Sequence, residues 1–423
     1  MATALVVGNM IGSGIFLLPA AMSAFGGVSL LGWLFTAGGA MLLALTFAWL
    51  ARCKPAAGGI YAYTRMAFGD FAGFLVAWSY WIAVWIANGA IAVALVSYLS
   101  VFIPAISESR ALGAGLTIAV LWLFTVVNLR GLRTAGLVQL VMTLLKLLPL
   151  LALSLWGLWF VEPDHFQPFN PTDQALLPAA GGAAALALWS MIGLESASIA
   201  AAKVENPRRN VARATLLGTG IAAVLTAVAC TVVMGVVPPE VLQASDAPFA
   251  DAARQLWGGW GAVLLAVTAV ISCMGALNGW ILLQGQLPQV MADDGLFPPF
   301  AGRENRHGAP AAALILGTVL TSGVVLLNYS RSMAGLFGFL ALLGTLATLI
   351  PYLFCAMAGL RVLGADSEVP LRPWRAALLL LASLYALWTI AGAGQEVVYW
   401  GFLLLLTGLP VYVWLRRETP RAV

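Results

Sequence analysis

The sequence predicts an all-α integral membrane protein with twelve transmembrane helices. Of its 423 residues, 61% are hydrophobic and only 9% are charged, whereas a soluble domain carries about 25% charged residues. A helix that crosses a bilayer needs roughly 20 apolar residues, so this chain has room for about a dozen such helices joined by short loops. These observations exclude a soluble protein and leave no stretch for a separate soluble domain.

Each expected span is an apolar run bounded by charge, proline or glycine. The third and eighth runs exceed the length of one crossing, which indicates helices that are tilted or that project beyond the bilayer. The spans are 3–25, 27–51, 70–103, 111–130, 133–160, 175–201, 210–237, 252–291, 309–328, 332–361, 374–393 and 396–415.

The basic residues predict the orientation, because lysine and arginine are enriched in cytoplasmic loops. With twelve spans, Arg110, Arg254 and Arg331 fall on one side and Lys146 falls within a span. The remaining seventeen of the 21 basic residues fall on the side of the two termini. We therefore expect both termini in the cytoplasm. The net charge of +4 reflects this topology, and such dispersed basic residues exclude nucleic acid as a partner.

The few remaining charges restrict the chemistry. Glu195 and Lys146 are the ionisable residues within spans, while His165 and His307 lie in loops. The four cysteines have no metal-type spacing. Without paired carboxylates, an intramembrane histidine or a metal cluster, the sequence gives no basis for an enzyme, a metal site or a cofactor.

Two spans are interrupted at mid-membrane. The first span contains GNMIGSG at 8–14, and the sixth contains WSMIGLE at 189–195. Glycine and polar residues are tolerated within a membrane span where the backbone lines a cavity. The two interruptions occupy the first position of two five-span blocks, 1–160 and 175–361, as an inverted repeat requires. The spans in 374–415 stand outside this repeat.

An unwound segment exposes amide groups at the start of one half-helix and carbonyl groups at the end of the other. The amides suit a substrate carboxylate and the carbonyls suit an ammonium group. Together they form a clamp for an α-amino acid. The alternative is that the glycines at 12 and 14 serve close helix packing, as in GxxxG contacts.

Motifs in and beside these spans carry a resemblance to a known family. They are GSGIF at 12–16, GGIYAY at 58–63, WSMIGLES at 189–196, VENPRRN at 204–210, APF at 247–249, GW at 279–280 and ADDGLFPP at 292–299. The first four resemble the amino acid–polyamine–organocation (APC) superfamily of transporters. The last three narrow the resemblance to the basic amino acid/polyamine antiporters, most closely the bacterial arginine/agmatine antiporters.

The resemblance implies a single transporter domain over 1–423 with a five-plus-five inverted repeat, broken first and sixth spans and alternating access. It also implies a homodimer in the lipid bilayer of the bacterial inner membrane. Ser13 and Gly14 would hold the substrate carboxylate. Backbone carbonyls at Met10, Trp189 and Ile192 would accept from the α-ammonium group.

The same resemblance implies that Ala83, Val84 and Asn88 meet the guanidinium end, and that Trp189 and Trp280 sandwich the substrate. A desolvated contact between a cation and a tryptophan ring is worth about 2 kcal/mol. Asn88 lies on one helix face with Val84, four residues before it. The alternative for Asn88 is a hydrogen bond to a neighbouring helix, and for the tryptophans it is core packing.

A gate toward the outside is the implied role of Tyr80 and Glu195, with Tyr352 and Asn9 in support. An ionisable residue within a span is a functional candidate by default. We hypothesise that Glu195 takes up a proton in the mildly acidic range and couples external acidity to gating. The alternative is a structural carboxylate hydrogen-bonded to its neighbours.

Some residues depart from the pattern of the arginine/agmatine antiporters. Gly344 replaces a serine of the distal pocket, which weakens the assignment of arginine. Lys146 lies 13 residues beyond Arg133, about 20 Å along a helix, and resembles the lysine that replaces a coupling cation in sodium-independent relatives. The alternative is a fixed cation bonded to carbonyls of the first span. The smaller departures are Met10 for isoleucine, Val84 for cysteine and Ile91 for methionine.

The leading functional hypothesis is a transporter that exchanges arginine for its decarboxylated amine, agmatine. The second hypothesis is a broader or neutral amino acid transporter, proton-linked or an exchanger, in which Lys146 takes the place of a coupling cation.

Overall fold

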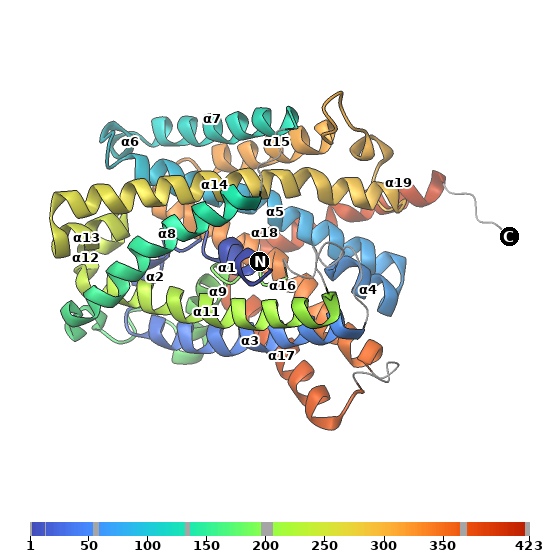
Figure 1. Cartoon of the computed structure of the whole chain (residues 1–423), viewed down its shortest axis with the longest axis horizontal. Helices are drawn as coiled ribbons and strands as arrows, with labels where there is room; N and C mark the ends of the chain where they lie inside the picture. Colours follow the sequence, from blue (N-terminus) through green and yellow to red (C-terminus); the bar gives the residue numbers. More distant parts are fainter. Residues whose placement is uncertain are drawn as a thin grey trace.

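The computed structural model describes residues 2–12, 14–53, 59–131, 136–195, 206–363 and 370–418. Within these ranges the regular structure is helical and contains no strand, and the long helices run along the long axis of the molecule (Figure 1). The α-helices are α1 (Ala2–Met10), α2 (Leu18–Ser23), α3 (Val28–Cys53), α4 (Ile60–Phe68), α5 (Asp70–Leu99), α6 (Ala105–Glu108), α7 (Arg110–Leu129), α8 (Gly136–Gly157), α9 (Leu176–Trp189), α11 (Pro207–Val236), α12 (Pro239–Gln243), α13 (Pro248–Trp257), α14 (Gly259–Asp293), α15 (Ala311–Leu327), α16 (Met333–Val362), α17 (Pro373–Gly392), α18 (Gln395–Leu406) and α19 (Gly408–Glu418).

The helices have the length and apolar character of membrane spans. In the described part of the chain, eight segments are long and apolar enough to cross a bilayer, and three shorter apolar helical stretches accompany them. This confirms the all-α membrane class. The longer segments are Val28–Cys53, Asp70–Leu99, Arg110–Leu129, Arg209–Val236, Gly259–Asp293, Met333–Val362, Pro373–Gly392 and Gln395–Leu415.

Helix α5 is the central element of the bundle. It is apolar on every face, which is the pattern of a helix enclosed by others, and it packs against α4, α7, α14, α15 and α16. Two hydrogen bonds from its side chains tie it to its neighbours. Trp81 donates through Nε1 to the Gln284 carbonyl on α14 (3.2 Å), and Ser79 donates to the Ala347 carbonyl on α16 (2.7 Å).

Two expected spans have different boundaries in the structure. The span expected at 252–291 is wrong as a single helix, because α13 ends at Trp257 and α14 begins at Gly259. Gly258 separates them with φ +77°, a backbone conformation that glycine adopts at no steric cost. The span expected at 396–415 is likewise divided, into α18 and α19, on either side of Thr407.

Helices α3 and α9 approach closely where glycine permits it. A Cβ atom on Gly32 would lie 2.6 Å from Cβ of Ala183 and 2.9 Å from its carbonyl carbon. The Thr36 hydroxyl, one turn further, donates to the Ala184 carbonyl (3.0 Å). Small residues let backbones come together in this way in membrane proteins, where packing rather than the hydrophobic effect drives helix association.

We predict that Gly32→Ala lowers the thermal stability of the purified protein, because the added methyl group would overlap the backbone of α9. The cost should be about 1–3 kcal/mol, as for other overpacked sites. Gly38→Ala on the same helix is the matched control, since a Cβ there would meet nothing within 4 Å. Thermal unfolding in detergent measures both variants. Equal stability of the two would contradict the close contact.

Candidate functional site

The two interrupted spans meet at the centre of the molecule. Helix α1 ends at Met10 and α2 begins at Leu18, while α9 ends at Trp189 and turns follow it to Glu195. The remainder of the sixth expected span, from residue 196, lies outside the described residues, so the second interruption is defined as 190–195. A Cβ atom on Gly14 would lie 3.1 Å from Nε1 of Trp189. The backbone of the first interruption therefore lies directly against the indole ring at the second.

A small cavity lies between these interruptions and helices α5 and α14. Its volume is about 20 Å³, enough for one water molecule, which needs about 10–15 Å³. Ligand pockets measure about 300–1,000 Å³, so in this conformation the walls must separate before an amino acid fits. The lining residues are Met10, Gly14, Ala87, Ile91, Trp189, Ile192 and Trp280.

Most of the expected substrate residues meet at this cavity. Met10, Gly14, Trp189, Ile192 and Trp280 all line it. The indole N–H of Trp189 is buried and has no hydrogen-bond partner in the described chain. The site thus combines two aromatic rings with backbone from two helix interruptions.

The contribution of α5 differs from the expectation. Ala83 and Val84 are buried on this helix but are not among the lining residues, whereas Ala87 and Ile91 are. Ala87 was not predicted, although it lies one helical turn before Ile91 on the same face. Ser13 lies outside the described residues.

Asn88 forms the hydrogen bond to a neighbouring helix that the alternative interpretation expects. Its Nδ2 donates to Oε1 of Gln284 on α14 (2.8 Å). Its carboxamide oxygen, Oδ1, is buried and has no partner in the described chain. Asn88 therefore links α5 to α14 through its nitrogen, while its oxygen remains available as a hydrogen-bond acceptor.

Glu195 joins the second interruption to two other helices. It is fully buried and accepts hydrogen bonds from Tyr80 of α5 (2.5 Å) and from the hydroxyl of Tyr352 on α16. It also accepts from the Gly193 amide (3.2 Å). The structure thus brings together the three expected gate residues, while the side chain of Asn9 lies outside the described atoms.

The end of α1 is held by two side chains from other helices. The Nζ atom of Lys146, which is buried on α8, donates to the Gly8 carbonyl (2.7 Å). Ser272 of α14 donates to the Gly12 carbonyl (3.1 Å). A cation is favourable at a helix C-terminus because the unpaired carbonyls there carry partial negative charge. Lys146 therefore compensates backbone groups that the interruption leaves free.

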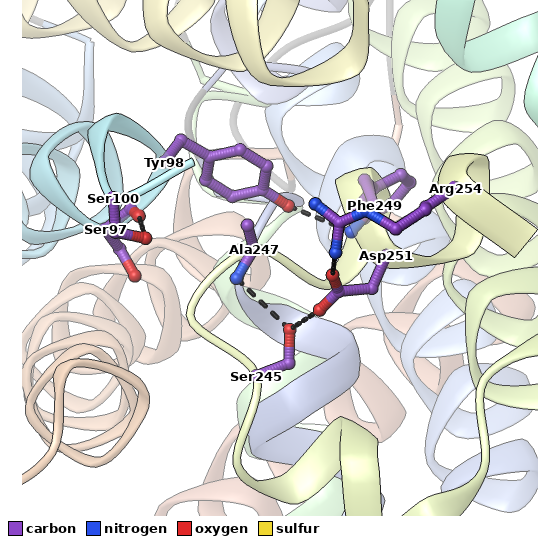
Figure 2. A network of polar contacts seen from close by, with 8 residues as sticks. All are labelled: Ser97, Tyr98, Ser100, Ser245, Ala247, Phe249, Asp251 and Arg254. Atoms are coloured by element: carbon purple, nitrogen blue, oxygen red, sulfur yellow. Dashed lines mark hydrogen bonds and ion pairs between the residues drawn. The ribbon is translucent and has the colours of Figure 1, made fainter. Parts of the chain in front are cut away.

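Tyr98 joins the first interruption to α13 at one end of the bundle. Its hydroxyl donates to the Phe16 carbonyl (2.9 Å) and accepts from the Phe249 amide (3.0 Å), a contact drawn in Figure 2. Figure 2 also shows Asp251 between Ser245 and Arg254, with contacts of 2.6 and 3.0 Å. This network, which sequence reasoning missed, fixes the start of α13 over the interruption.

Comparisons with known proteins give matches along nearly the whole chain. The model of the amino acid permease family matches residues 1–414. The chain is 35% identical over 378 residues to the cadaverine/lysine antiporter of Escherichia coli strain K12, covering 86% of this chain and 83% of that protein. It is 32% identical over 413 residues to the putrescine transporter PotE of the same strain and of Haemophilus influenzae, covering 97% of this chain and 94% of each relative.

These matches extend over nearly the whole chain and include both interruptions and the cavity. They are matches to membrane transporters and not to enzymes. The chain therefore belongs to the amino acid permease family of the APC superfamily, and within that superfamily to the basic amino acid/polyamine antiporters.

Proposed function

We propose that this protein exchanges a cationic amino acid for the amine that remains after its decarboxylation. The observation that carries the proposal is the cavity between two helix interruptions, which Trp189 and Trp280 line together. The backbone of the interruptions suits the α-amino and carboxylate groups. The tryptophan rings suit a cation. The names of the relatives, a cadaverine/lysine antiporter and putrescine transporters, support the same pair of substrates.

Within this class, the site favours a substrate with a distal ammonium group. A guanidinium group has five N–H donors and an ammonium group has three. The side chains that line the cavity offer no oxygen acceptor, and Gly344, which lies against the Trp189 ring, replaces the serine that the arginine/agmatine antiporters carry. Lysine or ornithine with the corresponding diamine is thus our first choice, and arginine with agmatine is the second.

Alternating access through an inverted repeat of twelve spans is the mechanism that we propose. The helix contacts support it, because α1 packs on α11 as α9 packs on α3. A second parallel lies in the short helices α4 and α13. Each precedes a central helix and is separated from it by one glycine in a similar conformation, Gly69 (φ +87°) and Gly258 (φ +77°).

We further propose that both termini face the cytoplasm. Support comes from the basic residues, seventeen of which fall on the side of the termini. With this orientation α13 lies on the outer side and α4 on the inner side. The Tyr98 network then closes the outer end of the first interruption.

The contacts of Glu195 suit a proton-sensitive gate. An ionised carboxylate only accepts hydrogen bonds, and Tyr80, Tyr352 and the Gly193 amide all donate to it. A proton on one oxygen turns that oxygen into a donor, so at least one tyrosine contact must rearrange. Protonation therefore loosens the link between α5, α16 and the second interruption.

The contact between Lys146 and the Gly8 carbonyl favours a second candidate function. In a broader or neutral amino acid transporter, the lysine would stand in for a coupling cation at the end of α1. Loss of its proton would remove the charge that holds this carbonyl and would release α1. This candidate requires that neutral amino acids compete with cationic ones.

We predict that proteoliposomes loaded with cadaverine accumulate labelled lysine, while empty vesicles do not. Each cycle should export one positive charge, because the incoming lysine carries a carboxylate and the diamine does not. Competition by ornithine, arginine, agmatine and alanine ranks the substrates. Alanine competing as strongly as lysine would favour the second candidate, and no uptake with any amine inside would refute the exchange.

We predict that Glu195→Gln removes the pH dependence of exchange. The wild-type rate should rise several-fold between neutral and mildly acidic external pH, because acid protonates the carboxylate and loosens the gate. The glutamine variant should be fast at both values, since its amide resembles the protonated acid. Glu240→Gln, at an exposed carboxylate of α12, is the control. A wild-type profile in Glu195→Gln would exclude this role.

We predict that Lys146→Ala lowers the exchange rate per folded protein at least tenfold, because the Gly8 carbonyl loses a charged donor. A charged hydrogen bond is worth about 1.5–3 kcal/mol, which corresponds to roughly this change. Labelled substrate uptake, divided by the amount of monodisperse protein, is the measurement. Unchanged kinetics with poorer expression would mean that Lys146 is purely structural.

A further inference from the structure

Behind the cavity, Gln284 forms a buried polar contact on α14. It lies one helical turn beyond the lining residue Trp280 and is fully buried. Its Nε2 donates to the Leu314 carbonyl (2.8 Å) and to the Thr318 hydroxyl (3.2 Å), both on α15. Gln284 therefore connects α14, which carries the lining residue Trp280, to α15.

These contacts fix which way the glutamine amide points. A backbone carbonyl can only accept a hydrogen bond, so the nitrogen of Gln284 must face Leu314. The oxygen Oε1 must then face α5, where Asn88 donates to it through Nδ2 (2.8 Å). The glutamine thus dictates that Asn88 turns its nitrogen toward α14 and keeps its oxygen free.

Asn88 lies beside the cavity, although it does not line the cavity in this conformation. Asn88 follows Ala87 and precedes Ile91 by three residues, and both neighbours line the cavity. Oδ1 is buried and has no hydrogen-bond partner in the described chain. A buried acceptor without a partner destabilises a protein, so a ligand that supplies N–H donors would remove this cost.

The surrounding residues are arranged to hold Gln284 in place. A Cβ atom on Gly317 would lie 2.4 Å from Cδ of Gln284, so glycine is required there. Thr318 is hydrogen-bonded to Thr125 of α7 (2.7 Å), which extends the network to a fourth helix. Buried hydrogen-bond networks of this kind restrict the side chains that take part in them.

We propose that Gln284 is a positioning residue for cation selectivity. It does not contact the substrate, but it orients Asn88 so that Oδ1 is free to accept from the distal ammonium group once the cavity walls separate around a cationic amino acid. If the carboxamide turned round, its two N–H groups would face the cation and oppose binding. The inference rests on the proposed function, because it assumes that cationic amino acids occupy the cavity.

The test compares lysine with norleucine, which has the same aliphatic stem without the ammonium group. Competition assays in proteoliposomes give the ratio of the two affinities. Gln284→Met removes the amide at similar size and should reduce the preference for lysine about tenfold, the value of one hydrogen bond to a charged group. The affinity for norleucine should stay the same.

A second variant reaches the same contact from another helix. Gly317→Ala should displace the Gln284 side chain and reduce the preference for lysine to a similar extent. Gly323→Ala, also on α15, is the matched control, because a Cβ there meets nothing within 4 Å. Adding Asn88→Asp to Gln284→Met should restore the preference, since a carboxylate presents an acceptor in either orientation.

The outcomes separate the two proposals. If wild-type protein does not exchange lysine, the proposed function is wrong. If it does, an unchanged lysine preference in folded Gln284→Met overturns the positioning role, as does an equal loss of affinity for lysine and norleucine. If Gln284→Met does not fold, the same two results with Gly317→Ala decide the question.

Discussion

The bilayer offers no hydrogen-bond partners, so each interrupted helix must have its backbone groups satisfied by the protein itself. At the first interruption, Lys146 donates a hydrogen bond to the Gly8 carbonyl and Ser272 donates to the Gly12 carbonyl. Tyr98 donates to the carbonyl of Phe16. At the second, the carboxylate of Glu195 accepts from the Gly193 amide. These polar side chains, which would be unfavourable in lipid, therefore lie beside the backbone that has left the helix.

The polar contacts of the molecule are of two kinds. Some can pair in only one way, and others involve groups that can gain or lose a proton. Helices α5, α14 and α15 are joined by buried side-chain bonds such as those of Gln284, whose donors and acceptors can pair in only one way. The contacts at the interruptions include two groups that can change their protonation, Glu195 and Lys146. A transporter needs both, because a fixed frame keeps the site intact while a smaller element moves.

The sequence is sufficient to locate the interruptions, because glycine and polar residues weaken a helix in lipid and are tolerated where the protein itself satisfies the backbone. It also identifies Trp189, Trp280 and Glu195, whose chemistry is unusual at that depth. The partners could not be predicted, because Asn88 and Gln284 are 196 residues apart and no local pattern links them. The boundary at Gly258 was missed for a related reason, since a glycine between apolar residues continues a hydropathy run even when its φ of +77° ends the helix.

The absence of charge on the cavity walls affects how strongly each of the two proposed substrates would bind. None of the residues that line it is ionised, so a bound cation would be held by aromatic rings and backbone dipoles, together with the amide oxygen of Asn88 if Gln284 positions it as proposed. A fixed carboxylate in their place would bind a diamine, with its two charges, far more tightly than an amino acid. Neutral acceptors would reduce this difference between the two substrates of the proposed exchange. The direction of the proposed exchange is set by the concentration gradients of the amino acid and the amine and, because each cycle moves one charge, by the membrane potential.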